Sequence, residues 1–470
     1  MEIKLDILLE LVHSWSLEDD ARYTIDEIKE WYDYLNNSLI VDINFAEYND
    51  ASEWEYNSET DWIERKSGAF FSIAGLKSSD HSVEQPIILQ KEIGYLGMIA
   101  QIQEGVLHFL VQAKIEPGNV NKIQLSPTIQ ATHSNFTQVH KGAKPKYLDY
   151  FMNANKHLIL FDQIQSEQSS RFLGKRNRNI VIYVEEEVEI KVFDNFRWMT
   201  LGQIKTLMKF DNIVNMDTRT VLSCLPISIL EQKPNSNYLL AFSDLILGRS
   251  ILSSPYRSSE LAKVYHYINN YKMFNHTRHE ICGLSQLPNW RWDGSIFMSD
   301  KFDNFRVVFC NVQIDKREVV KWQQPLFQAS GIALFALAYR VNNGIMEFLV
   351  QCKPEPGSFD KLELAPTWQL EANERGLLNE SKFGEILQKK LKENHNIRNH
   401  VFLSEEGGRF YHEQNENIVY ELSYNEYKYA PSEEEGFFWL THKELNLSML
   451  YNNVLNIQLR NLLSLLTNKN

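Results

Sequence analysis

The chain has 470 residues, of which 43% are hydrophobic and 12% aromatic, enough for at least two packed cores and too many for a disordered protein. The formal net charge of −13 argues against a general nucleic-acid binder, because affinity for phosphate comes mainly from clustered Lys and Arg. The four cysteines stand far apart without a C-x-x-C pair, which disfavours a zinc site or a disulfide framework and predicts buried free thiols in a reducing, cytoplasmic setting.

The N-terminal segment predicts an amphipathic helix. Its sequence, MEIKLDILLELVHSWSLEDD, interrupts the apolar residues with Glu2, Asp6 and Glu10 and lacks the basic start of a signal peptide. Nowhere in the chain do about twenty apolar residues run together. We therefore expect no membrane span.

The chain is an internal duplication. Residues 85–130 align without a gap on residues 324–369, a constant offset of 239, and 17 of the 46 aligned positions are identical. The densest match sets FLVQAKIEPG against FLVQCKPEPG. The match extends outward in both directions: before this region IKEWYDYLNN aligns with LAKVYHYINN, and after it FRWMT aligns with FFWLT. Each half therefore holds a full unit of domain size.

The sequence pattern of each unit predicts a helix, several strands, a mixed segment and a closing helix, in that order. This order indicates an α+β fold. Residues 105–112 (GVLHFLVQ) are typical of a buried strand, and the following Lys-x-Glu-Pro-Gly predicts a turn, because Pro fixes φ and Gly accepts left-handed backbone. We place the boundary in the polar segment QKPN. The two predicted domains are residues 1–233 and 234–470.

A strand with polar side chains follows the turn. In IQLSPTIQAT the alternating polar residues share one face of an extended strand. Such a face can be the solvated side of a sheet, or it can bind a sugar, since it lacks the Lys and Glu of an ordinary surface. The residues proposed to contact a sugar are Gln124, Ser126, Thr128, Gln130 and the nearby Asn135.

A basic segment distinguishes the two copies. RFLGKRNRNIVI aligns on RFYHEQNENIVY, yet three cations of the first copy are replaced by Glu413, Gln414 and Glu416. A cationic cluster can be a solvated loop, but Arg and Lys also suit a diphosphate, and this chain is otherwise acidic. We expect the first copy to bind a nucleotide diphosphate through Arg171, Lys175, Arg176 and Arg178.

Acid or base candidates lie close to this strand. His133 and His140 follow it and have no histidine counterpart in the second copy. Glu116 and Glu355 occupy the same turn in the two copies, where a turn-stabilising role is equally open. Tyr147 is the fourth candidate. The second copy either binds differently or is a structural remnant, and its candidate residues are Glu355, Glu363, Thr367, Gln369 and Arg409.

These segments resemble the NDP-hexose 2,3-dehydratases. The resemblance rests on EIGYLGMIAQ, HFLVQAKIEPGN, QLSPTIQATHSNFTQVHKG and RFLGKRNRN in the first half and on EVVKWQQPLF, KPEPGSFDKLELAPTWQ and EEGGRFYH in the second. It implies two tandem Nudix-like domains, each a mixed β-sheet flanked by helices, and a homodimer. The sequence lacks the G-x5-E-x7-R-E-x-x-E-E-x-G run of hydrolytic Nudix enzymes, which disfavours metal-dependent hydrolysis.

The resemblance also implies a reaction and its partners. The substrate would be a dTDP-linked 4-keto-6-deoxyglucose, in which the carbonyl acidifies the C3 hydrogen, so that a base forms an enolate and the C2 hydroxyl leaves. No redox cofactor, pyridoxal group or metal is required, and a 3-ketoreductase would act on the product. Two other functions stay open: a non-catalytic nucleotide-sugar binding protein and a diverged nucleotide diphosphate hydrolase.

Overall fold

The computed structural model describes the chain except for residues 1–4, 21, 48–52, 133–143, 230–238, 240–241, 316–319 and 469–470. The first half contains α1 (Leu5–Ser16), α2 (Ile25–Asn37), β1 (Val41–Phe45), β2 (Trp54–Asn57), β3 (Trp62–Arg65), β4 (Ser72–Ser78), β5 (Glu84–Leu89), β6 (Gly94–Gln103), β7 (Val106–Ile115), β8 (Ile123–Ser126), β9 (Ile129–Ala131), α4 (Leu148–Met152), β10 (Leu158–Ser166), β11 (Arg176–Tyr183), β12 (Phe196–Met199), α5 (Leu201–Leu207) and α6 (Met216–Ser223). The boundary proposed within QKPN lies outside the described residues.

The second half repeats this order. It contains α8 (Leu245–Leu252), α9 (Ser258–Phe274), β13 (His279–Cys282), β14 (Arg291–Asp293), β15 (Ile296–Met298), β16 (Phe305–Ile314), β17 (Lys321–Ala329), β18 (Leu334–Asn342), β19 (Ile345–Pro354), β20 (Leu362–Ala365), β21 (Trp368–Leu370), η4 (Ala372–Glu380), α10 (Lys382–Glu393), β22 (Ile397–Ser404), β23 (Gln414–Glu421), β24 (Phe437–Thr441), α11 (His442–Ser448) and α12 (Ile457–Ser464). The predicted α+β class and the duplication are therefore confirmed.

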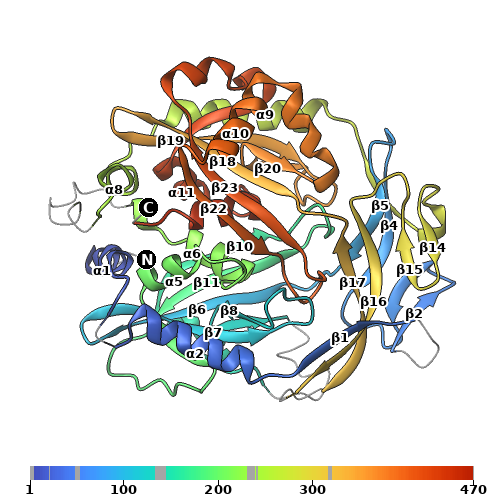
Figure 1. Ribbon diagram of the computed structural model, residues 1–470, viewed down its shortest axis with the longest axis horizontal. Coiled ribbons are helices and arrows are strands. Elements are labelled where there is room, and N and C mark those ends of the chain that lie inside the picture. The colour runs from blue at the N-terminus through green and yellow to red at the C-terminus, as the bar shows by residue number, and fades with distance from the viewer. Residues whose placement is uncertain are drawn as a thin grey trace.

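Each repeat is built on a seven-stranded mixed sheet. The first has the order β10-β11-β6-β7-β12, with β8 on β7 and β9 on β6, and the second has the order β22-β23-β18-β19-β20, with β21 on β18 and β24 on β19. Among the paired strands of the described residues, the central pairs β6–β11 and β18–β23 are parallel and the others antiparallel. In Figure 1 the two sheets lie on either side of α5, α6 and α11.

The two repeats exchange strands in the smaller sheets. Strand β1 of the first repeat pairs antiparallel with β16 of the second, with Val41 opposite Ile314 and Phe45 opposite Cys310. Strand β13 of the second repeat pairs in the same way with β4 of the first. Each five-stranded sheet thus contains a strand from the other half, and both lie together at one end of the molecule (Figure 1).

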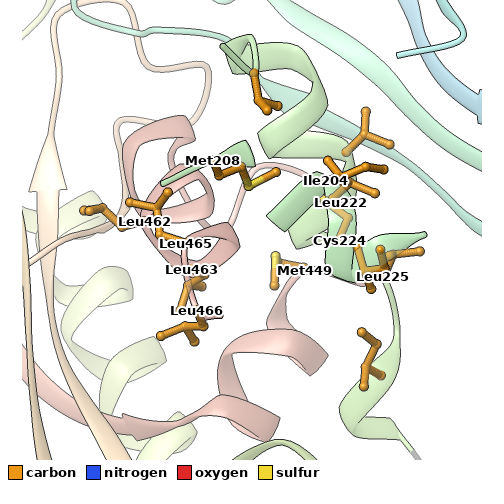
Figure 2. Close-up of a cluster of buried hydrophobic side chains, with 14 of the residues drawn as sticks. Ile204, Met208, Leu222, Cys224, Leu225, Met449, Leu462, Leu463, Leu465 and Leu466 are labelled. Carbon is orange, nitrogen blue, oxygen red and sulfur yellow. The ribbon is translucent and has the colours of Figure 1, made fainter. Parts of the chain in front are cut away.

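A single hydrophobic core spans both repeats. It includes the apolar faces of α1, α5, α6, α11 and α12 and one face of each seven-stranded sheet. Figure 2 shows the point where helices of the two halves meet, with Leu222 and Cys224 of the first half near Met449 of the second. Because burial of apolar surface is the main favourable term in folding, the halves stabilise each other.

The matched motifs FRWMT and FFWLT end a strand and begin a helix in each repeat. Thr200 accepts a hydrogen bond from the backbone N–H of Gln203, and Thr441 accepts one from the N–H of Glu444, which forms a capping box in each case. The same sequence signal therefore sets the start of α5 and α11.

Three of the four free cysteines are buried as predicted, and Cys282 is half-buried. The predicted N-terminal helix forms as α1. Among the described residues, no helix is long and apolar enough to cross a membrane.

Cutting the chain between residues 233 and 234 tests the strand exchange. We expect neither half to fold alone, because each would lose an edge strand and expose the shared core, whereas the co-expressed halves should purify as one complex. Circular dichroism and urea unfolding measure this. A monomeric half that unfolds cooperatively would contradict the exchange.

The buried Lys205 should make the free energy of unfolding depend on pH. Its side chain is buried over the Trp15 ring, 4.2 Å from the centroid, and donates to the Ser464 carbonyl at 2.7 Å, and this burial lowers its pKa to about 7. An unfolded lysine keeps its proton to about pH 10. The unfolded state therefore binds more protons between pH 7 and 10, and the free energy of unfolding rises with pH there by at most about 1.4 kcal/mol per unit. We expect Lys205→Met to abolish this rise in urea unfolding curves, and an unchanged slope would refute it.

Candidate functional site

A buried carboxylate occupies the turn after β7 in the first repeat. Glu116 is 7% exposed and accepts hydrogen bonds from Lys114 Nζ at 2.9 Å and from Gln130 Nε2 at 3.0 Å. Lys114 and Glu116 are two positions apart at the end of a strand, so their side chains lie on one face. The charge of the carboxylate is thereby matched by a cation and an amide donor.

Asn215 fixes this arrangement from the start of α6. Its Oδ1 accepts from the N–H of Thr218 at 2.9 Å as the helix N-cap. Its Nδ2 donates to Ser126 Oγ at 2.9 Å and to Gln130 Oε1 at 3.3 Å. The Gln130 amide is therefore oriented with its Nε2 toward Glu116.

The second repeat contains the same constellation. Glu355 accepts from Gln369 Nε2 at 2.8 Å and from Asn456 Nδ2 at 3.4 Å, and Asn456 Nδ2 also donates to Gln369 Oε1 at 2.8 Å. Asn456 is the N-cap of α12. Burial raises the pKa of Glu355, an effect opposed by Lys353 and by these two amide donors. Lysine, glutamate, glutamine and asparagine thus occupy equivalent positions in both repeats.

A cavity of about 150 Å³ opens beside this constellation in the second repeat. Its lining combines the polar side chains of Lys353 and Gln369 with the aromatic rings of Trp368 and Phe383, which stack at 5.5 Å between ring centroids. Such a mixture of polar and aromatic groups suits a ring that has both hydroxyl groups and apolar C–H faces. The cavity is lined by Gln351, Lys353, Thr367, Trp368, Gln369, Leu370, Phe383, Pro431 and Phe437.

Thr128 and Thr367 have a backbone role that the sequence did not predict. Strands β6 and β7 separate beyond Ala100 and Phe109, and Thr128 Oγ1 lies at the fork, accepting from the Ile99 N–H at 3.0 Å and donating to the Leu110 carbonyl. Thr367 makes the equivalent bonds to the backbone of Ala338 and Leu349. The expected continuous strand is therefore wrong, because the chain breaks between β8 and β9 to fill this fork.

Gln124 and Glu363 point toward the opposite repeat. Gln124 Nε2 donates to Ser404 Oγ at 2.6 Å, and Glu363 accepts from Ser166 Oγ at 2.7 Å. Burial raises the pKa of Glu363 to about 8. Of the predicted polar face, the structure joins Ser126 and Gln130 to Glu116 through Asn215, but not Gln124 or Thr128.

The expected patch of four cations does not form. Arg178 donates two hydrogen bonds to Asp162, and Arg176 lies over the Phe359 ring of the second repeat, 3.8 Å from its centroid. Lys175 is buried and donates to the Glu92 carbonyl, and Arg171 is buried against Glu371 of the second repeat. Lys175 and Arg176 diverge because the loop before β11 is buried between the repeats, while Arg178, on the same strand face as Arg176, is held by Asp162 instead.

The acid or base candidates are only partly described. His133, His140 and Asn135 lie outside the described residues. The hydroxyl of Tyr147 donates to the Lys191 carbonyl at 2.7 Å, and burial raises its pKa to about 12. Arg409, the counterpart of Arg171, is buried over the Phe71 ring and donates to Gln90 Oε1 at 3.1 Å.

Sequence reasoning missed the lysines and asparagines of the constellation. Lys114 and Lys353 are identical in the alignment of the copies, as are Asn215 and Asn456, so the repeat itself carried the signal. The cavity aromatics Trp368 and Phe383 have no identical partner in the first copy. In the part of the chain that the structure describes, no three His, Cys, Asp or Glu side chains gather in a way that could hold a metal ion.

Comparison with known proteins gives the family. A family model described as NDP-hexose 2,3-dehydratase matches residues 25–225 and 261–466. The chain therefore belongs to the NDP-hexose 2,3-dehydratase family.

Its relatives include three proteins named dTDP-4-dehydro-6-deoxy-alpha-D-glucopyranose 2,3-dehydratase. The protein of Saccharopolyspora spinosa is 36% identical over 90% of this chain and 87% of its own length. That of Amycolatopsis orientalis is 30% identical over 95% and 91%, and that of Streptomyces violaceoruber 34% identical over 88% and 90%.

Replacing Thr128 or Thr367 by Val tests their backbone role. Each change leaves a buried N–H and a buried carbonyl without a partner, which costs about 1–3 kcal/mol of stability. Urea unfolding measures the loss, and we expect similar values for both variants because the bonds are equivalent. A neutral effect on stability would show that the fork does not need the hydroxyl.

Proposed function

We propose that this chain removes water from dTDP-4-dehydro-6-deoxyglucose by taking the C3 proton and expelling the C2 hydroxyl. The product relaxes to a 3,4-diketo-2,6-dideoxyhexose. The observation that supports this most directly is the Lys, Glu, Gln and Asn constellation, which occurs in both repeats and whose Lys353 and Gln369 line a cavity in the second. Family membership supplies the class of reaction.

The roles follow from the chemistry of a 4-keto sugar. The carbonyl at C4 acidifies the C3 hydrogen, and Glu355 is the proposed base. The Lys353 ammonium, on the cavity wall, is proposed to stabilise the negative charge that develops on the C4 oxygen. The C3–H bond breaks, its electrons form the C3–C4 double bond of the enolate, and these electrons then expel the C2 oxygen.

One carboxyl group can serve both proton transfers. In the gluco configuration the C3 hydrogen and the C2 hydroxyl lie on the same face of the ring, so the protonated glutamate can return its proton to the departing hydroxyl, which leaves as water. Burial raises the pKa of Glu355, which makes its conjugate acid easier to form and to hold at the site. The reaction consumes no oxidant or reductant.

The cavity is sized for the sugar and not for the whole substrate. Its volume of about 150 Å³ is below the ~300–1,000 Å³ of sites that enclose a complete ligand of drug size. We therefore place the hexose against Lys353, Gln369 and Trp368, with the diphosphate and nucleoside outside the cavity. This assigns turnover to the second repeat, whereas the sequence alone favoured the first.

We also propose the fold of each repeat, the assembly of the protein and its partner enzyme. Each repeat is a Nudix-like unit, the protein acts as a cytoplasmic homodimer, and a 3-ketoreductase acts on its product. A binding protein without turnover remains the alternative, and it would leave the substrate intact. A hydrolase would release the nucleoside monophosphate.

Paired glutamine variants test the function and the choice of repeat. Purified protein is incubated with dTDP-4-dehydro-6-deoxyglucose, a 3-ketoreductase and NADPH, and the trapped product is followed by mass spectrometry. We expect a 2,6-dideoxy product, a loss of about 100-fold or more in kcat for Glu355→Gln, and a change below about threefold for Glu116→Gln.

Heat-treated protein is the control for this assay. Intact substrate with wild-type protein would overturn the dehydratase assignment. Loss of turnover in Glu116→Gln with normal turnover in Glu355→Gln would move the reaction to the first repeat.

A further inference from the structure

Arg171 crosses from the first repeat to the residue that directly follows the wall of the second-repeat cavity. Its side chain is 2% exposed, lies over the Phe305 ring at 4.0 Å, and donates to Glu371 Oε2 at 3.0 Å. Glu371 directly follows β21, whose residues line the cavity, and it caps the start of η4. Arg171 of the first repeat thus holds Glu371, the residue at which the cavity wall of the second repeat ends.

The same loop of the first repeat contacts the turn that carries Glu355. The N–H of Gly357 donates to the Ser169 carbonyl at 2.7 Å, and the Gly357 carbonyl accepts from the N–H of Gly174 at 2.7 Å. A Cβ atom at Gly357 would lie 1.9 Å from the Phe172 carbonyl oxygen, so the contact admits only glycine. Residues 169–174 therefore touch both the turn with the proposed base and the end of the cavity wall.

The two repeats differ in this contact. Arg409 is the counterpart of Arg171, but it donates to the neutral Gln90 side chain, and Thr132 stands in the first repeat where Glu371 stands in the second. Of these two counterpart arginines, Arg171 is therefore the one paired with a carboxylate of the opposite repeat, next to the described cavity. A buried arginine that is bonded to a carboxylate and packed on an aromatic ring has few alternative positions.

We infer that Arg171 is a positioning residue for the second-repeat site, holding Glu371 and the cavity wall from the opposite repeat. This inference rests on the proposed function for its kinetic consequence. The arginine does not touch the substrate; it fixes the segment from Trp368 to η4 relative to Glu355. The active unit is then the pair of repeats, because residues 169–174 and the cavity come from different halves.

The test compares Arg171→Gln, Arg171→Lys and Glu371→Gln with Arg398→Gln as a matched control. Arg398 is also a buried arginine, 3% exposed and 2.7 Å from Asp244, but it lies outside the site proposed for turnover. We expect Arg171→Gln to lower kcat about ten- to hundredfold, since small displacements in a site have effects of that size. Arg171→Lys should recover part of the loss, and the Arg171→Gln/Glu371→Gln double variant should be no worse than Arg171→Gln alone.

Hydrogen–deuterium exchange supplies a readout that does not depend on turnover. Residues 355–358 and 368–380 should exchange faster in Arg171→Gln than in wild-type protein and remain unchanged in Arg398→Gln. Wild-type kcat and exchange in Arg171→Gln would overturn the inference, as would an equal loss of kcat in Arg398→Gln. A wild-type protein without turnover would instead overturn the proposed function, while the exchange comparison would still decide whether Arg171 holds the wall.

Discussion

The structure depends on the close packing of each repeat's Lys-x-Glu turn against a loop of the other repeat. A Cβ atom at Gly118 would lie 1.5 Å from the Phe410 carbonyl oxygen, and one at Gly357 would lie 1.9 Å from that of Phe172. Both turns therefore need glycine, because the backbones of the two halves are in direct contact. This contact buries Glu116 and Glu355, so the carboxylates can be held only if amide and ammonium groups surround them.

The polar interface between the repeats contains one of the charge differences between the two copies. The loop of the first repeat carries Lys175, whereas the aligned loop of the second carries Glu413. Both side chains are buried, and desolvation lowers the pKa of Lys175 and raises that of Glu413 to about 8. Arg171 opposes the shift at Glu413, so the loops are complementary to each other across the boundary. Of the charge differences that suggested a diphosphate clamp, Lys175 and Glu413 are buried between the halves, whereas Arg178 and Glu416 pair within their own repeats with Asp162 and Arg375.

The sequence was informative where a local signal decides the structure. The duplication, the order of elements, the helix starts at Thr200 and Thr441 and the helix α1 all follow from patterns of neighbouring residues. The exchange of β1 and β13 could not be predicted, because strand pairing across more than 200 residues leaves no local trace. The site was half predicted: Glu116, Ser126 and Gln130 do meet, but their link through Asn215 depends on how α6 packs under the sheet.

The most direct test of this account is the structure of the protein bound to dTDP-6-deoxyglucose. This analogue lacks the C4 carbonyl, so its C3 hydrogen is not acidic and the complex should persist. We expect the hexose to lie against Lys353, Gln369 and Trp368, with the nucleotide outside the cavity. A hexose bound elsewhere, for example in the hollow beside Arg398 and Glu421, would contradict it.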